Sequence, residues 1–201
     1  GLVMLMAEVA FNTLISDPGL CNQELPVIYQ RINNTLYKNI QERLSEKSTM
    51  GSQYSHLYMT FRLFRFDKAG NFSMFGNDHA EPFICRKKDG EITAIDSSGF
   101  IFGIVEDATM GGEPFEFKLE SGDLLVFYSD GVTEAHKETK EEAEKKGIEE
   151  REEFGEKRLY KIVRENRDQP LDQIIEKILS QLDEWLAVQE DDITLAILRK
   201  K

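Results

Sequence analysis

The sequence has little cysteine: Cys21 and Cys85 are the two in 201 residues. They show neither a CxxC spacing nor a disulfide framework, which argues against cysteine-rich zinc modules and small disulfide-stapled domains. Buried or idle thiols in a reducing cytosol are therefore expected, and with them a cytoplasmic location. A disulfide between the two cysteines stays open.

The sequence also lacks an apolar run of membrane-spanning length. Its apolar start, GLVMLMAEVAF, is too short to cross a bilayer and has neither the basic region nor the cleavage site of a signal peptide. Few helix breakers and apolar residues on nearly all sides predict a buried core helix from about Leu2 to Ile15. We therefore expect no membrane insertion in this segment.

Positive charge is in deficit. There are 25 basic residues against 37 acidic residues, and the formal net charge is -12. Such a charge repels phosphate backbones and anionic head groups, so nucleic acid is not an expected partner. The length and a 40% share of hydrophobic residues suit one sizeable core, which predicts a single domain over residues 1–201.

The first half of the chain predicts helices and then a strand meander. Apolar residues recur every four positions after Pro26, which predicts a helix to about Leu44, and a polar loop follows over residues 45–53. From His56 the period changes to two, and a turn over residues 67–71 makes a hairpin. Further strands are predicted over residues 72–75, 82–86, 91–95, 115–119 and 124–128. The last two are expected to pair as a hairpin.

The second half ends in helices and one strand. Residues 137–157 are almost wholly charged and predict a solvated helix interrupted at Gly147. Helices are expected over residues 159–165 and from near Pro170, and a last strand over residues 193–198. Helices, antiparallel strands and helices again predict an α+β fold with helices layered on sheets.

Three aspartates stand at the ends of two apolar strands. Asp130 follows the run from Leu124 to Tyr128, whereas Asp191 and Asp192 precede the last strand. If the two strands pair antiparallel, the end of one lies beside the start of the other, and the carboxylates meet at one sheet edge. Such carboxylates repel one another unless a cation lies between them, and their hard oxygens suit Mg²⁺ or Mn²⁺.

The residues alone leave a structural alternative open. Asp-Gly is a common turn pair, in which Asp130 would cap a nearby N–H and Gly131 would supply a positive φ. Asp191 and Asp192 would then merely cap the start of the last strand.

Two motifs together resemble a known family. The stretch LLVFYSDGVTEA, residues 124–135, followed by QEDDITLAILR, residues 189–199, resembles the bacterial SpoIIE/RsbU-like branch of the PPM metal-dependent serine/threonine phosphatases. GLVMLMAE is similar to the end of that family's first helix, PVIYQRINNTLYK is similar to its second, and EEFGEKRL fits the stretch before its C-terminal helix. The likeness covers nearly the whole chain.

The resemblance implies a fold, a metal site and a partner. The fold would be an antiparallel two-sheet β-sandwich flanked by helices, with a binuclear Mn²⁺ or Mg²⁺ site at one end. Asp130 and Asp191 would be the catalytic metal ligands, Gly131 would allow the close turn, and Asp192 would be an auxiliary ligand. A metal-bridged water would attack the phosphorus of a phosphoserine or phosphothreonine, so no side-chain nucleophile is required. The implied substrate is a STAS-like regulatory phosphoprotein of the anti-sigma-factor-antagonist type.

The chain departs from the family pattern because the first strands of the family are missing from it. In the family, those strands carry a Gly-Asp pair and a glycine-rich Asp motif that supply the bridging metal ligands, and this sequence contains neither motif. We therefore expect a domain incomplete at its N-terminus, holding at most one metal ion weakly and turning over poorly or not at all. The alternative is a non-catalytic pseudophosphatase that binds a signalling partner. Edges left by missing strands tend to pair with another chain, so a dimer is also expected.

The second departure is a charged insertion over residues 136–156, where relatives are usually shorter. It reads either as a solvated insertion or as a flap or partner-docking helix, and both readings stay open.

Overall fold

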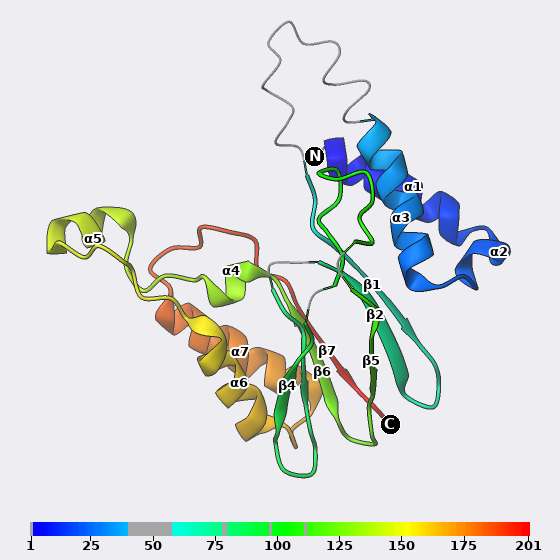
Figure 1. The fold of residues 1–201 in the computed structure, drawn as a ribbon. Helices are drawn as coiled ribbons and strands as arrows, with labels where there is room; N and C mark the ends of the chain where they lie inside the picture. Colours follow the sequence, from blue (N-terminus) through cyan, green and yellow to red (C-terminus); the bar gives the residue numbers. More distant parts are fainter. Residues whose placement is uncertain (1, 40–57, 78–79, 97, 111) are drawn as a thin grey trace, which may run out of the picture. The chain divides into compact units, whose positions relative to one another are not determined.

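The computed structural model describes residues 2–39, 58–77, 80–96, 98–110 and 112–201 (Figure 1). They form an α+β arrangement with two antiparallel sheets, as predicted. The chain divides into two compact units: Gly1–Asp78 with Ser97–Lys118, and His79–Asp96 with Leu119–Lys201. A single domain over residues 1–201 stays a prediction.

The first unit begins with three helices, α1 (Leu2–Ile15), α2 (Pro18–Cys21) and α3 (Leu25–Lys38). The bounds of α1 match the prediction, and α3 begins as predicted. The predicted continuation to Leu44 and the polar loop over residues 45–53 lie outside the described residues. Helix α2 was not predicted; it forms because Pro18 occupies its first turn and the Asp17 carboxylate accepts the Gly19 N–H at 2.8 Å.

The expectation that α1 is buried on nearly all sides is wrong. Ala7 and Ala10 are buried, whereas Met4 and Val9 are 68% and 59% exposed. The buried side of the helix packs in the core that contains α3. An apolar sequence predicts the helix but does not count its packing partners, so the exposure of its other side was missed.

The sheet of the first unit has the order β1 (Phe61–Phe66), β2 (Asn71–Asn77), β5 (Phe115–Lys118). The predicted start of its first strand, at His56, lies outside the described residues. Helix α3 packs on the sheet through Tyr29, whose ring centroid lies 4.2 Å from that of Phe102 and 5.1 Å from that of Phe75. These aromatic contacts form the centre of the first core.

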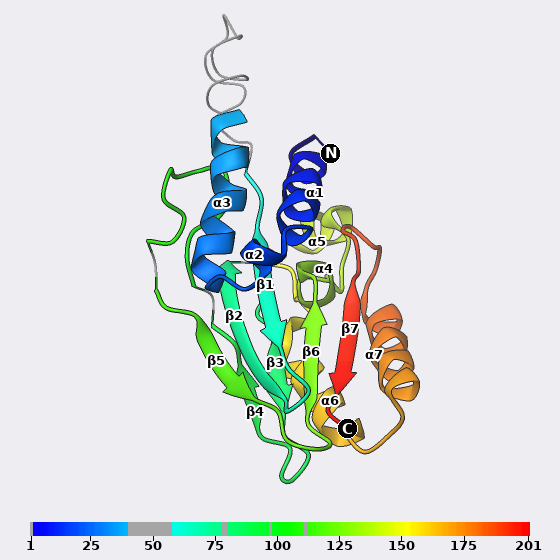
Figure 2. The ribbon, with the colours of Figure 1, turned by 90° about the vertical axis from the view of Figure 1, so that its right-hand side faces the viewer.

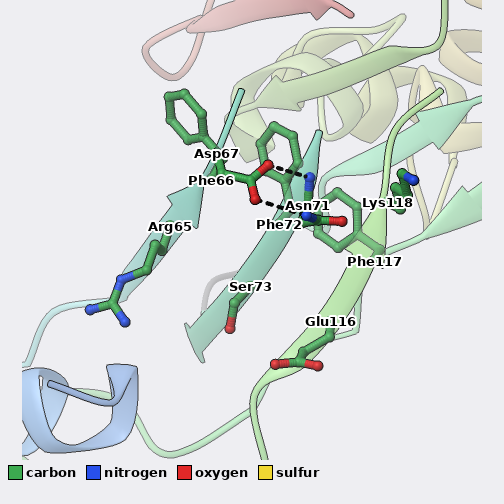
Figure 3. A pocket seen from close by; sticks show the side chains of 9 residues that line it. All are labelled: Arg65, Phe66, Asp67, Asn71, Phe72, Ser73, Glu116, Phe117 and Lys118. Atoms are coloured by element: carbon green, nitrogen blue, oxygen red, sulfur yellow. Dashed lines mark hydrogen bonds between the residues drawn. The ribbon is translucent and has the colours of Figure 1, made fainter. Parts of the chain in front are cut away.

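The predicted turn between β1 and β2 is confirmed. The Asp67 carboxylate accepts hydrogen bonds from the backbone and side chain of Asn71, at 3.0 and 2.8 Å (Figure 3). Beside it, Phe72 stacks between Phe66 and Phe117, one ring from each strand of the sheet, at centroid distances of 5.2 and 5.0 Å. This aromatic ladder lines a hollow of about 610 Å³.

The sheet of the second unit has the order β4 (Ile92–Ala94), β3 (Phe83–Cys85), β6 (Leu124–Tyr128), β7 (Leu195–Arg199), with every pair antiparallel (Figure 2). The predicted hairpin of β5 with β6 is wrong, because β5 pairs with β2 and β6 pairs with β3 and β7. A turn over residues 120–123 does follow β5, but turn chemistry reports a reversal of the chain and not the partners of the flanking strands.

Four helices complete the second unit: α4 (Asp130–Thr133), α5 (Lys140–Lys146), α6 (Gly155–Asn166) and α7 (Leu171–Trp185). Helices α6 and α7 cover one face of the sheet, where Val126 and Tyr128 of β6 join their apolar residues in one core (Figure 1). Leu125, which points to the other face, is also fully buried. Strand β6 is thus buried on both faces, as its unbroken apolar run predicted.

The structure bears on two further expectations, those for the cysteines and for membrane-spanning helices. Cys85 is a buried free thiol in β3, and burial raises its pKa. Within the described ranges, no helix is both long enough and apolar enough to cross a membrane.

A buried carboxylate holds the start of β6. The side chain of Asp123 accepts the N–H groups of Lys87 and Glu120, both at 2.9 Å, and pairs with Arg86 at 2.7 Å. Burial alone would raise the pKa of Asp123, but these hydrogen bonds and the Arg86 charge bring it below its usual value.

We expect Asp123→Asn to lower the free energy of unfolding at pH 7 by about 1–3 kcal/mol, because a charged acceptor of three donors is lost. The folded-state pKa of Asp123 lies below the unfolded value, so its stabilisation is present above about pH 4 and disappears as the pH falls through the folded pKa. Urea unfolding at several pH values should therefore show the gap to wild type narrowing in acid. The exposed Asp183→Asn is the control, and a gap independent of pH would contradict the assignment.

Candidate functional site

The pairing of β6 with β7 brings the predicted aspartates to one sheet edge. The register runs from Leu124 opposite Arg199 to Tyr128 opposite Leu195. Asp130 begins α4 two residues beyond Tyr128, and Asp192 lies three residues before Leu195 on the neighbouring strand. The antiparallel arrangement expected from the sequence is confirmed.

Ser129 extends this pairing beyond the two strands. Its N–H donates to the Thr194 carbonyl at 3.0 Å. Its hydroxyl donates to the Asp192 carbonyl at 2.8 Å and accepts the Thr194 N–H at 2.9 Å. Sequence reasoning gave Ser129 no role of its own, although its position between the apolar strand and Asp130 was the available signal. Ser129 therefore holds the backbone of Asp192 and Thr194 against the end of β6.

Gly131 provides the close approach that the site requires. It is buried, and a Cβ added to it would lie 2.5 Å from the Asp192 carbonyl oxygen. The expectation of a positive φ is wrong, because Gly131 continues the first turn of α4 and is not among the glycines with positive φ. Glycine is needed here because the backbone of Asp192 occupies the space of a side chain.

The two candidate ligands are each held by a neighbouring amide. One oxygen of Asp130 accepts the Gly131 N–H at 2.9 Å, and one oxygen of Asp191 accepts the Asp192 N–H at 2.7 Å. Asp130 is half-buried, whereas Asp191 and Asp192 are exposed. The capping part of the structural alternative is therefore present, and it leaves the second oxygen of each carboxylate as a candidate ligand.

The donor chemistry fits Mn²⁺ or Mg²⁺ in part. Both ions prefer hard oxygen ligands, which Asp130 and Asp191 supply from adjoining backbone segments. Such ions take about six ligands, however. Among the residues that the structure describes, no three His, Cys, Asp or Glu side chains gather closely enough to hold a metal ion. Asp130 and Asp191 therefore supply the right kind of donor atom, but the described residues do not form a complete coordination shell.

A hollow of about 240 Å³ lies beside Gly131 and Asp191. Glu190 on its wall makes a forked ion pair with Arg151, with N–O distances of 2.9 and 3.0 Å. This contact raises the pKa of Arg151 and lowers the pKa of Glu190. Sequence reasoning missed both residues, because each stands in a charged stretch without a distinguishing pattern. The hollow is lined by Gly131, Glu134, Ala135, His136, Lys140, Leu186, Val188, Gln189, Glu190, Asp191 and Ile193.

The fold is that of the PP2C-type phosphatases. The SiaA-PP2C domain of Pseudomonas aeruginosa superimposes with a TM-score of 0.70 at 16% identity, covering 98% of this chain and 69% of that domain. The catalytic domain of serine threonine protein phosphatase PstP, solved in complex with two manganese ions, gives a TM-score of 0.56 at 12% identity, covering 98% of this chain and 79% of that domain. At these identities the likeness concerns the fold.

The chain belongs to the Stage II sporulation protein E (SpoIIE) family of PPM, or PP2C-type, serine/threonine phosphatases; the family model matches residues 1–201. The phosphoserine phosphatase RsbU of Bacillus subtilis (strain 168) is 28% identical over 165 residues, which are 82% of this chain. The aligned residues make up 44% of the length of RsbU, so this chain spans less than half of that relative. The family assignment made from the two aspartate motifs is confirmed.

We expect Gly131→Ala to lower the free energy of unfolding by about 1–3 kcal/mol, because the new methyl group must displace the Asp192 backbone. Gly19→Ala is the matched control, since Gly19 also lacks a positive φ and its added Cβ would meet a side-chain oxygen of Asp17 at 3.2 Å. Urea unfolding of both variants measures the difference. Equal stabilities would show that the approach of Gly131 to Asp192 is not tight.

Proposed function

We propose that this chain is a metal-dependent phosphatase domain that removes phosphate from phosphoserine or phosphothreonine in a regulatory protein. The observation that carries the proposal is the close approach of Gly131, which directly follows Asp130, to the Asp191–Asp192 backbone beside the β6–β7 pairing, in a member of the SpoIIE family. RsbU, a relative at 28% identity, is named a phosphoserine phosphatase, which supports the substrate class. The proposed partner is a STAS-like phosphoprotein of the anti-sigma-factor-antagonist type, met in the cytoplasm.

In this proposal the chain's own residues hold and orient the reacting groups. Asp130 and Asp191 are the catalytic metal ligands, and Asp192 is an auxiliary ligand whose backbone is fixed by Ser129. Gly131 lets these segments approach one another. A bound divalent cation would lower the pKa of a coordinated water and bind the phosphoryl oxygens. The proposed architecture around the site is a two-sheet β-sandwich flanked by helices.

The number of ligands argues for weak metal binding by this chain. Divalent-cation affinity rises with the number and charge of the ligands, and among the described residues no three His, Cys, Asp or Glu side chains gather closely enough to hold a metal ion. We therefore propose at most one weakly held Mn²⁺ or Mg²⁺ and slow turnover. The same observation favours a second candidate, a pseudophosphatase module that binds the phosphoprotein without hydrolysing it.

The test is Mn²⁺ titration by calorimetry together with hydrolysis of a phosphoserine peptide. Asp130→Asn and Asp191→Asn should each abolish saturable Mn²⁺ binding and lower hydrolysis by roughly 100-fold or more, because each removes an anionic metal ligand. The exposed Asp183→Asn carries the same charge change on helix α7 and should behave as wild type.

The outcomes separate the two candidates. Peptide binding without Mn²⁺-dependent hydrolysis by the wild type would favour the pseudophosphatase. Mn²⁺-dependent hydrolysis that persists in both aspartate variants would overturn the assignment of Asp130 and Asp191.

A further inference from the structure

The charged insertion is joined to the second unit by a paired stem. The Lys137 N–H donates to the Glu152 carbonyl at 3.0 Å, and the Phe154 N–H donates to the Ala135 carbonyl at 2.8 Å. His136 and Glu153 form a bridge between these two bonds. Helix α5 stands between the two sides of the stem, and Gly147 at φ 68° ends it. The solvated reading thus suits α5, whereas the stem is built into backbone structure.

The stem also holds the loop that carries Asp191. This loop runs from Leu186, after α7, to Asp192, and its Ala187 N–H donates to the His136 carbonyl at 3.0 Å. At the end of α7, the Trp185 ring N–H donates to the Ala135 carbonyl at 3.2 Å. The start of this loop over residues 186–192, called the acidic loop below, is therefore hydrogen-bonded to the insertion as well as connected to α7.

The other end of the loop is held by Arg151. Both terminal nitrogens of its guanidinium bind the two carboxylate oxygens of Glu190, and one of them also donates to the Glu138 carbonyl at 3.1 Å. The Arg151 side chain is 14% exposed, so the pair is partly shielded from water. A two-pronged contact of this kind fixes direction as well as distance. Glu190 directly precedes Asp191 in the chain.

We propose that Arg151 is a positioning residue of the phosphatase site: it holds Glu190 and thereby fixes the backbone that presents Asp191 beside Asp130. The inference rests on the proposed function for its effect on metal binding and turnover. Arg151 itself contacts none of the proposed ligands through any described hydrogen bond. Arg151 acts on Asp191 only through Glu190. In this proposal the insertion therefore helps to hold the Asp191 segment in place.

Charge and geometry predict opposite effects of removing Arg151. The loss of a nearby cation leaves a more negative site, which by Coulomb's law alone strengthens the binding of Mn²⁺. The loss of the Arg151–Glu190 contact lets the Asp191 segment fluctuate. Binding of Mn²⁺ is then weaker, because the Asp191 carboxylate must be ordered when the ion binds. The sign of the change in affinity therefore distinguishes positioning from simple electrostatics.

The experiment measures Mn²⁺ affinity by calorimetry and hydrolysis of a phosphoserine peptide. Arg151→Ala should weaken Mn²⁺ binding roughly three- to tenfold, against the strengthening that its lost charge alone would give. Glu190→Gln should also weaken binding, and the double variant should be no worse than either single one, because both substitutions disrupt the same Arg151–Glu190 pair. Arg151→Lys keeps the charge but not the fork and should recover only part of the affinity. Lys145→Ala, which removes one positive charge from exposed α5, is the matched control and should bind as wild type.

A second readout does not depend on metal or activity. In the metal-free protein, hydrogen exchange of the amides over residues 186–192 should be faster in Arg151→Ala than in wild type and in Lys145→Ala. Unchanged exchange there, or tighter Mn²⁺ binding by Arg151→Ala, would overturn the positioning role. A wild type that neither binds Mn²⁺ nor hydrolyses the peptide would instead overturn the proposed function, and the exchange rates would still decide whether Arg151 orders the loop.

Discussion

The antiparallel pairing of β6 with β7 is the constraint on which the candidate site depends. Asp130 and Asp191 are far apart in the sequence, and five paired residues bring their strand ends together. A slip of one residue would turn every side chain of a strand to the other face, so the one-sided burial of β7, with Ile197 buried and Leu198 exposed, holds this register. Ser129 then extends the register by its hydroxyl, and Gly131 permits the last close contact.

The candidate site is built from two kinds of support that differ in strength. The sheet supplies backbone hydrogen bonds backed by a buried core, which includes Tyr128 and Val132 on either side of Asp130. The acidic loop before β7 has exposed carboxylates and depends more on side-chain contacts, above all on the forked pair of Arg151 with Glu190. A charged insertion that looks dispensable in composition thus contacts the least supported part of the site.

Much of the fold could be predicted because its signals are local. The period of four in α3, the period of two in β1 and the apolar run of β6 each appear within one segment, so the type of each element could be read from local sequence. The pairing of β5 with β2 could not be read in this way, because a turn does not identify the partner of the strand that it leaves. The exposed side of α1 was missed for a related reason, since burial depends on elements elsewhere in the chain.

The sequence by itself determined the chemistry of the site: aspartates after one apolar strand and before another, a glycine between strand and helix, and the family to which these motifs point. Only the tertiary structure decided why the glycine is needed, which hydroxyl holds the acidic backbone, and which arginine in a charged run contacts it. The physical reason is that residue type and spacing are written along the chain, whereas a close approach, a hydrogen bond or an ion pair exists only when distant segments share the same space.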